Sequence, residues 1–419
     1  MNKKDDENMT EEIKWVKGGI CAPKGFLAGS VHCGIRKNKD KKDLALILSR
    51  KQCKVACTYT QNKVKGAPIL VTQANVKNGK AQAIICNSGN ANTCNANGIE
   101  VAAKMCKLAG SAVGVDPRDV VVASTGVIGQ PLDITPIENS IRPLVASLTA
   151  RSSGSRGACE AIMTTDTVVK EFACQFVCGG KKVRIGAIVK GSGMIHPNMA
   201  TMLAFLTTDC CISAELLQKC VSEVVKDTFN MVSVDGDTST NDMLTVMANG
   251  MIENIEITHE ESADYKAFKK ALFEICKMLS RAIAKDGEGA SKLLECTVTG
   301  APTEKTAKMV AKSVITSSLF KAAMFGADAN WGRVLCAIGY TQAEFDITKI
   351  AVCFKSATGL INVCKDGAGV EFDEVLAKKV LSCDEIEIEI EMNQGKMNAT
   401  AWGCDLTYDY VKINGDYRT

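Results

Sequence analysis

Apolar residues recur along this chain with two periods, one typical of strands and one typical of helices. Short apolar runs between polar residues predict strands over 54–60, 67–72, 81–87, 119–124, 171–176, 183–189, 202–206, 244–247 and 385–392. Helical spacing predicts helices over 99–114, 137–148, 213–230, 261–285 and 309–325, the third capped by Ser213. The two kinds of element alternate without a strict strand–helix–strand rhythm, which predicts layered α/β or α+β sheets and marks no sharp domain boundary.

The composition is that of an ordinary globular protein. Of the 419 residues, 46% are hydrophobic and 23% charged, and the net charge of +3 gives no general attraction to nucleic acid or membrane. Aromatic residues, at 5%, are too few for a protein that stacks bases. No apolar run approaches the length of a membrane helix, and the charged N-terminus lacks a signal-peptide core. We therefore expect a cytoplasmic protein with no nucleic-acid or membrane partner.

Twenty cysteines are scattered from Cys21 to Cys404, and the CxxC spacing never occurs. Zinc and iron–sulfur sites usually show tighter pairs or histidine partners, and the chain has only three histidines. In a chain without an export signal, most of these cysteines should be reduced and buried as small hydrophobic residues. The sequence therefore predicts no metal.

The segment from Lys190 to Asp209, KGSGMIHPNMATMLAFLTTD, joins a glycine-rich loop to an apolar run. Thr201 would stand at the mouth of a buried strand, where a rigid element could hold its hydroxyl. A threonine hydroxyl needs an adjacent base to act as a nucleophile. Cleavage between Ala200 and Thr201 would supply an α-amine with a reference pKa of about 7.7–8.0. Taken alone, the segment favours a buried strand that begins with threonine.

Other motifs leave their function open. The polar turn over 233–242, SVDGDTSTND, has Thr240 where a calcium loop needs glycine and Val246 where it needs glutamate, which excludes an EF-hand. It predicts either a hydrogen-bonded turn or the support of a site. KDGEGAS and GADANWGRV lack phosphate-loop spacing. His196 is expected to anchor its own turn, and this interpretation is favoured over the role of a catalytic base.

A tight turn is predicted at Thr125 and Gly126, directly after the strand over 119–124. The Gly126 N–H and the Thr125 hydroxyl could both point at the negative charge that develops on a tetrahedral intermediate. On local sequence alone, an ordinary strand-to-loop turn is the favoured interpretation.

These pieces, in this order, resemble the ornithine acetyltransferase family of arginine biosynthesis. The resemblance extends from Pro23 to Thr419 and rests on blocks that are together far more specific than one motif. The blocks are NSGNAN (87–92), ASTGVIG (123–129), MTTDT (163–167), the segment 190–209, SVDGDTSTND, KDGEGA, GADANWGRV and DYVKINGDYRT.

The resemblance implies a precursor that cuts itself between Ala200 and Thr201. One chain, 1–200, and a second, 201–419, which begins with the nucleophile Thr201, are expected. Members of the family accept an acetyl group from N2-acetyl-L-ornithine onto this threonine, release ornithine, and pass the acetyl group to L-glutamate. Acetyl-CoA is expected as a second acetyl donor, and no other cofactor is implied.

The resemblance also assigns roles to individual residues. Thr125 and Gly126 are expected to stabilise the oxyanion. Substrate contacts are expected at Thr167, Lys190, Thr201, Glu288, Asn414 and Thr419. Charge agrees with two of these assignments, because Lys190 suits a substrate carboxylate and Glu288 suits the ammonium of ornithine.

The fold implied is a layered αββα sandwich with a smaller α/β portion, its two fragments interleaved and paired as an α2β2 heterotetramer. Two alternatives stay open. An aminopeptidase or amidohydrolase on a similar self-cleaving scaffold would share the first half of the mechanism, with water in place of glutamate. A precursor that never matures would act as a scaffold without activity.

Overall fold

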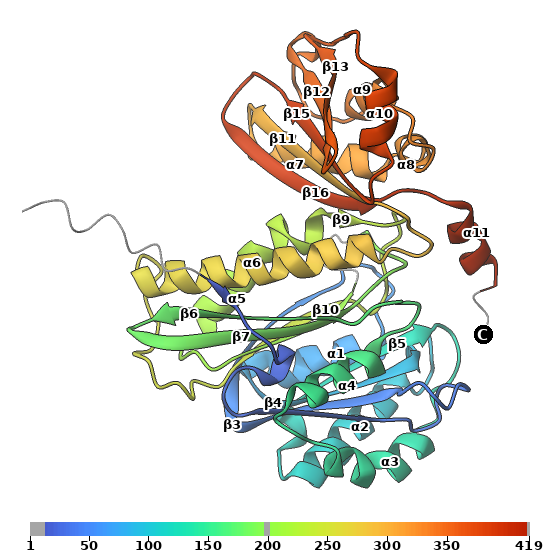
Figure 1. Ribbon diagram of the computed structural model, residues 1–419. Helices are drawn as coiled ribbons and strands as arrows, with labels where there is room; N and C mark the ends of the chain where they lie inside the picture. The colour runs from blue at the N-terminus through green and yellow to red at the C-terminus, as the bar shows by residue number, and fades with distance from the viewer. Residues whose placement is uncertain (1–12, 197–201, 417–419) are drawn as a thin grey trace, which may run out of the picture.

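The computed structural model describes residues 13–196 and 202–416. Three expectations, on Thr201, on the bond that precedes it and on Thr419, therefore fall outside the described residues. The remaining chain forms a large layered body and a smaller portion that lies above it in Figure 1. The C-terminal helix extends beside both, in red.

The large body is built on a mixed sheet that has nine strands within the described ranges. Its order is β1 (Lys14–Trp15), β6 (Lys170–Cys178), β7 (Lys181–Lys190), β8 (Leu203–Thr208), β10 (Met243–Ala248), β3 (Leu44–Tyr59), β4 (Lys80–Asn90) and β5 (Val120–Val127), with β2 (Phe26–Val31) paired to β3. β8 runs parallel to β10 and β4 parallel to β5, while the other pairings are antiparallel.

Helices cover both outer faces of this body. In Figure 1, α6 lies above β6 and β7, and α2 and α3 lie below β3 and β4. The helices of the body are α1 (Ala67–Asn75), α2 (Gly98–Val113), α3 (Thr135–Ala146), α4 (Ser152–Ile162), α5 (Ala214–Asp227) and α6 (Ala263–Lys285). The predicted helix over 261–285 is confirmed as α6, and Ser213 caps α5 by accepting the Leu216 N–H.

A separate apolar core lies between the two halves of the sheet. Ile47 and Ile84, from β3 and β4, share this core with Phe205 and Met247, from β8 and β10. Along β8 the side chains alternate, so Leu206 packs instead into the core that α5 and α6 cover. The order of layers is helix, sheet, sheet, helix, and the predicted αββα sandwich is confirmed.

The smaller portion contains a second sheet of seven strands among the described residues. Its order is β14 (Ala368–Gly369), β13 (Gly359–Lys365), β12 (Ala351–Ser356), β15 (Glu385–Glu391), β11 (Leu293–Ala301), β16 (Met397–Cys404) and β9 (Val232–Ser233). Its helices are α7 (Glu304–Thr316), α8 (Ser318–Phe325), α9 (Trp331–Gly339) and α10 (Glu374–Leu381), and α11 (Tyr408–Gly415) follows β16. The expected smaller α/β portion is therefore present.

Two local predictions are wrong. The apolar run over 67–72 forms the start of α1 because Gly66 begins the helix in an extended conformation and Pro68 fits the first turn, where its missing N–H costs nothing. The periodicity of such a short apolar run cannot distinguish a strand from a buried helix segment. The predicted helix over 309–325 is two helices, because Ser317 ends α7 and its hydroxyl caps α8 by accepting the Phe320 N–H.

The predicted turn at Thr125 and Gly126 is also wrong, because β5 continues through Val127. Gly126 has φ of +133°, and a Cβ there would lie 2.3 Å from the Gly89 carbonyl carbon and 2.5 Å from the Asn90 nitrogen. Only glycine allows β4 and β5 to approach so closely at this point. Thr125 and Gly126 are therefore the end of a strand and not a flexible turn.

All 20 cysteines are free, and 15 of them are buried, as the sequence predicts. Cys94 and Cys336 are the two exposed ones. Among helices of the described ranges, none combines the length and apolar character needed to cross a membrane.

Candidate active site

A cavity of about 390 Å³ lies where several strands of the large sheet end. It is bounded by the end of β5, the end of β7 and the starts of β8 and β10, together with the loop 163–169 between α4 and β6. This volume lies within the range of small-molecule sites, about 300–1,000 Å³.

Five of the residues expected in the site line this cavity: Thr125, Gly126, Lys190, Glu288 and Asn414. They come from β5, from β7, from the loop after α6 and from α11, so the fold brings together residues nearly 300 positions apart.

The other expected residues lie elsewhere. Thr167 is exposed and is not part of the cavity lining; its amide and hydroxyl both donate to Asp286. Thr201 and Thr419 are outside the described residues. Met202 and Leu203, which follow Thr201, line the cavity.

Lys190 is the cation of the cavity. It is the last residue of β7 and is only 8% exposed. Among the described residues no carboxylate forms an ion pair with its ammonium, although its charge helps to lower the pKa of Asp166. A nearly buried ammonium that forms no ion pair within the described chain is costly to desolvate and favours an anionic ligand. Lys190 is therefore placed to bind a carboxylate.

Glu288 supplies the opposite charge. It is 7% exposed, its N–H donates to the Ser192 carbonyl at 2.9 Å, and its Oε2 accepts a hydrogen bond from Asn414 Nδ2 at 2.9 Å. Gly193 lines the cavity beside it, and a Cβ on Gly193 would lie 2.2 Å from the Glu288 carboxyl group. The absence of a side chain at Gly193 makes room for the Glu288 carboxylate.

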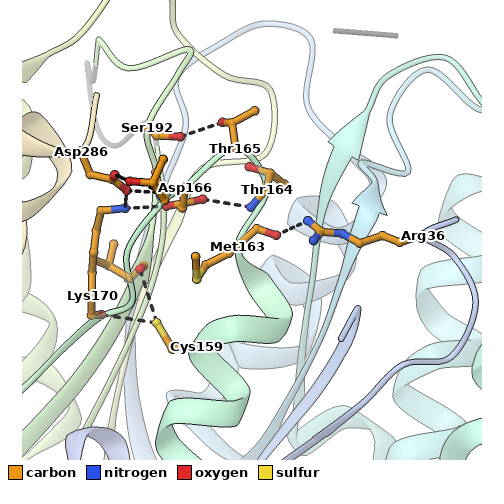
Figure 2. A network of polar contacts seen from close by, with 12 residues as sticks. Arg36, Cys159, Met163, Thr164, Thr165, Asp166, Lys170, Ser192 and Asp286 are labelled. Carbon is orange, nitrogen blue, oxygen red and sulfur yellow. Dashed lines mark hydrogen bonds and ion pairs between the residues drawn. The ribbon is translucent and has the colours of Figure 1, made fainter. Parts of the chain in front are cut away.

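Three buried charged residues stand behind Lys190 and Glu288, and we call Asp166, Lys170 and Asp286 the ion triad. Figure 2 shows the Lys170 ammonium between the two carboxylates, 2.7 Å from Asp166 Oδ1 and in contact with Asp286. Burial raises the pKa of Asp166, but Lys170 and then Lys190 outweigh burial and lower it to about 2. Burial lowers the pKa of Lys170, and the two carboxylates outweigh burial and raise it. Asp166 and Lys170 are therefore both charged at neutral pH.

The ion triad also organises the loop 163–169. Asp166 Oδ2 accepts the Thr164 N–H at 2.9 Å, and Thr165 Oγ1 lies 2.7 Å from Ser192 Oγ (Figure 2). Thr164 and Thr165 line the cavity. At the start of the loop, the Arg36 guanidinium donates to the Met163 carbonyl. We refer to this loop, the ion triad, Lys190 and Glu288 as the charged wall.

Another part of the cavity lining is held by uncharged groups. The Asn241 amide nitrogen donates to the carbonyls of Ala91 at 2.6 Å and Ser124 at 2.9 Å, and its Oδ1 accepts from Thr93 and Thr240 at 2.6 Å each. Because Ser124 precedes Thr125, Asn241 fixes the end of β5 relative to the start of β10. We refer to Thr93, Thr240, Asn241 and the end of β5 as the neutral wall.

Asp242, next to Asn241, is a cavity residue that the sequence analysis did not single out. It is 3% exposed, and its Oδ2 has no hydrogen-bond partner in the part of the chain that the structure describes. Burial raises the pKa of its carboxyl group well above the ordinary value, although Ser239 and Lys190 act against this. The carboxyl group is thus biased toward its neutral form.

The turn over 233–242 supports the site, which decides between the two interpretations of its sequence. Asp235 accepts the N–H groups of Met194, at 2.7 Å, and Ile195, at 2.8 Å, and so fixes the loop that follows Lys190. His196 Nδ1 lies 3.1 Å from Ser233 Oγ, and burial followed by the charge of Lys312 lowers the His196 pKa to about 4. His196 is outside the cavity lining, and its contact with Ser233 connects its loop to β9.

Comparison with known proteins gives a consistent result. The sequence model of the ArgJ family matches residues 27–419. The chain is 51% identical to the arginine biosynthesis bifunctional protein ArgJ 1 of Clostridium acetobutylicum, over 94% of this chain and 96% of that protein. It is 46% identical to the arginine biosynthesis bifunctional protein ArgJ of Bacillus subtilis, over 98% of each. A crystal structure of the argJ protein of Bacillus halodurans, 46% identical, covers 51% of this chain and 99% of its own, with a TM-score of 0.49.

Proposed function

Because this chain belongs to the ArgJ family, we propose that it is an N-acyltransferase of arginine biosynthesis that moves an acetyl group from N2-acetyl-L-ornithine to L-glutamate. The products are ornithine and N-acetylglutamate. The alternative of an aminopeptidase or amidohydrolase is set aside, because the matching family and the curated relatives are named for arginine biosynthesis.

The observation that carries the proposal is the charge pattern of the cavity. Lys190 and Glu288 line the same cavity, and neither has an ion-pair partner within the described chain. The other acidic residue of the lining, Asp242, is biased by burial toward its neutral form. N-acetylornithine carries one carboxylate and one ammonium, so each of its ends has a complementary group. Asn414 holds Glu288 in place, and Thr167 and Thr419 complete the substrate contacts that we propose.

Maturation comes first in the proposed mechanism. The Thr201 hydroxyl attacks the Ala200 carbonyl, and the peptide nitrogen leaves as the amine of Thr201. Water then hydrolyses the ester, which gives the chains 1–200 and 201–419. The freed amine serves as the base that takes the proton of the same hydroxyl during turnover.

Transfer proceeds in two halves. Thr201 Oγ attacks the acetyl carbonyl of N-acetylornithine, and the oxyanion accepts hydrogen bonds from the Thr125 hydroxyl and the Gly126 N–H. Collapse of this intermediate releases ornithine and leaves an acetyl ester on Thr201. The amine of glutamate attacks that ester through a second oxyanion at the same donors. In this mechanism the protein supplies a nucleophile, a base and hydrogen bonds.

The word bifunctional in the names of the relatives favours a second activity. We propose that acetyl-CoA also acetylates Thr201, so that the enzyme can both recycle acetyl groups and introduce new ones. We further propose that the mature enzyme is cytoplasmic and pairs as a heterotetramer of two chains of each kind.

The test is an acetyl-transfer assay of the purified protein with N-acetylornithine and glutamate. We expect ornithine and N-acetylglutamate in equal amounts, with little free acetate, and no transfer by Thr201→Ala. Release of acetate at the same rate with and without glutamate would contradict the proposal and support a hydrolase. Acetyl-CoA in place of N-acetylornithine tests the second activity.

A further inference from the structure

The ion triad connects the two charged ends of the cavity without lining it. Lys170 is 2% exposed and is absent from the cavity lining, so it does not contact a bound substrate. Its ammonium lies between Asp166 and Asp286, which belong to two different segments of the charged wall (Figure 2).

On one side, Asp166 fixes the backbone next to Lys190. Its Oδ1, which contacts the Lys170 ammonium, also accepts the Gly191 N–H at 2.7 Å. Gly191 directly follows Lys190, so the position of the cation depends on the position of the Asp166 carboxylate.

On the other side, Asp286 fixes the backbone next to Glu288. Asp286 ends α6, two residues before Glu288, and holds the amide and hydroxyl of Thr167. The Glu288 N–H then donates to the Ser192 carbonyl at 2.9 Å. Because Ser192 follows Gly191, the two sides meet, and the contacts form a closed ring in which Lys170 joins the two carboxylates.

We propose that Lys170 is a positioning residue that sets the separation of Lys190 and Glu288, and that this separation selects the chain length of the donor. The inference rests on the proposed function, in which Lys190 binds the carboxylate of an acetylated diamino acid and Glu288 binds its side-chain ammonium. A donor with one methylene more or fewer reaches only one of the two groups in full.

A neutral residue at position 170 would leave two buried carboxylates that repel each other across the ring. The loop 163–169 and the end of α6 would then separate, and Lys190 and Glu288 would move with them. A residue that acts only on stability would instead lower the rate with every donor by the same factor.

The experiment compares Lys170→Met with Lys170→Arg and with a matched control, Lys308→Met. Lys308 also lies between two carboxylates, Asp227 and Glu304, but it is outside the cavity. For each protein kcat and KM are measured separately with the Nα-acetyl derivatives of 2,4-diaminobutyrate, ornithine and lysine.

In the wild type, we expect kcat/KM for the ornithine derivative to exceed that for the other two by roughly 10- to 200-fold, the usual effect of one methylene. Lys170→Met should reduce this preference about tenfold or more, mainly through a higher KM for the ornithine derivative. Lys170→Arg should restore part of the preference, and Lys308→Met should leave it unchanged.

A preference that survives in Lys170→Met, with all three donors slowed equally, would overturn the inference, as would a wild type without preference among the donors. If Lys170→Met does not fold, Asp286→Asn replaces it in the experiment. The same ratio of kcat/KM values, ornithine derivative over the other two donors, is measured, and the same loss of preference is expected. A wild type that transfers acetyl from none of the donors would contradict the proposed function itself, before the variants are compared.

Discussion

The two walls of the cavity are held by different interactions. The charged wall depends on Lys170, which has a carboxylate on each side, whereas the neutral wall depends on one amide, Asn241, with four hydrogen bonds. The charged wall positions the groups that we propose bind the ends of the substrate. The neutral wall positions Thr125 and Gly126, which we propose donate hydrogen bonds to the oxyanion.

The difference matches the task of each wall. Hydrogen bonds from a neutral amide keep their strength at every pH, which suits donors that must hold a fixed geometry toward a short-lived charge. Buried charges exert a field beyond their contacts, as the effect of Lys190 on the pKa of Asp166 illustrates. Such a wall attracts charged substrates, but its stability depends on pH.

The largest expected effect is on the free energy of unfolding, which should fall by different amounts when the residue that holds each wall is replaced. Lys170→Met leaves two buried carboxylates without their cation and should lower the free energy of unfolding by about 3–5 kcal/mol. Asn241→Ala leaves buried carbonyls unsatisfied and should cost about 1–3 kcal/mol. Lys308→Met, which removes two more exposed ion pairs, should cost about 0–1 kcal/mol. Denaturant unfolding measures all three, and equal losses for the first two would remove the distinction.

The next effect concerns catalysis at the neutral wall. Gly126→Ala places a Cβ against the Gly89 and Asn90 backbones and should displace an oxyanion donor. Loss of such a donor typically lowers kcat by about 10²–10³-fold. Gly129→Ala is the matched control, since Gly129 also has a positive φ, +79°, but has no atom within 4 Å of the added Cβ. Equal kcat values for the two variants would contradict the assigned role of Gly126.

A smaller effect tests the charged wall by pH. The pKa of Asp166 is lowered to about 2 in the folded protein and is about 3.9 in an unfolded chain. Its stabilising contribution, on the order of 2 kcal/mol, should be complete above the unfolded value and disappear as the pH falls through 2. The free-energy difference between the wild type and Asp166→Asn, measured from pH 2 to 6, should shrink at the acid end. For Asn241→Ala the difference from wild type should stay constant.

The smallest effect sharpens the role of Glu288 within the charged wall. Gly193→Ala forces the Glu288 carboxylate to move, because the new Cβ would lie 2.2 Å from it. We expect a several-fold higher KM for N-acetylornithine with little change in kcat. Gly339→Ala, at a glycine where nothing lies within 4 Å, is the control. An unchanged KM in Gly193→Ala would show that Glu288 does not bind the donor.

The sequence predicts the layers of the fold well, because the period of the apolar residues reports which face of each element is buried. The helix over 261–285 has 23 residues in α6 and a capping Ser262, so its signal is strong. The run over 67–72 is too short for its period to be read, and the structure makes it a helix.

The candidate site was likewise predictable only in part. The expected cavity residues came from motifs that resemble a known family, and five of them meet in one cavity. The ion triad was not predictable, because Lys170 looks like an ordinary charged residue at the start of a strand and Asp286 lies 116 residues away. Asp242 is the last residue of the polar turn over 233–242, where an acid is ordinarily solvated, and only the fold buries it.

The most direct test of the account is the intact mass of the denatured protein, before and after incubation with N-acetylornithine in the absence of glutamate. We expect two chains, 1–200 and 201–419, of which only the second gains the mass of one acetyl group and loses it again when glutamate is added. A single chain of 419 residues that gains no acetyl group would contradict the self-activated threonine on which the mechanism depends.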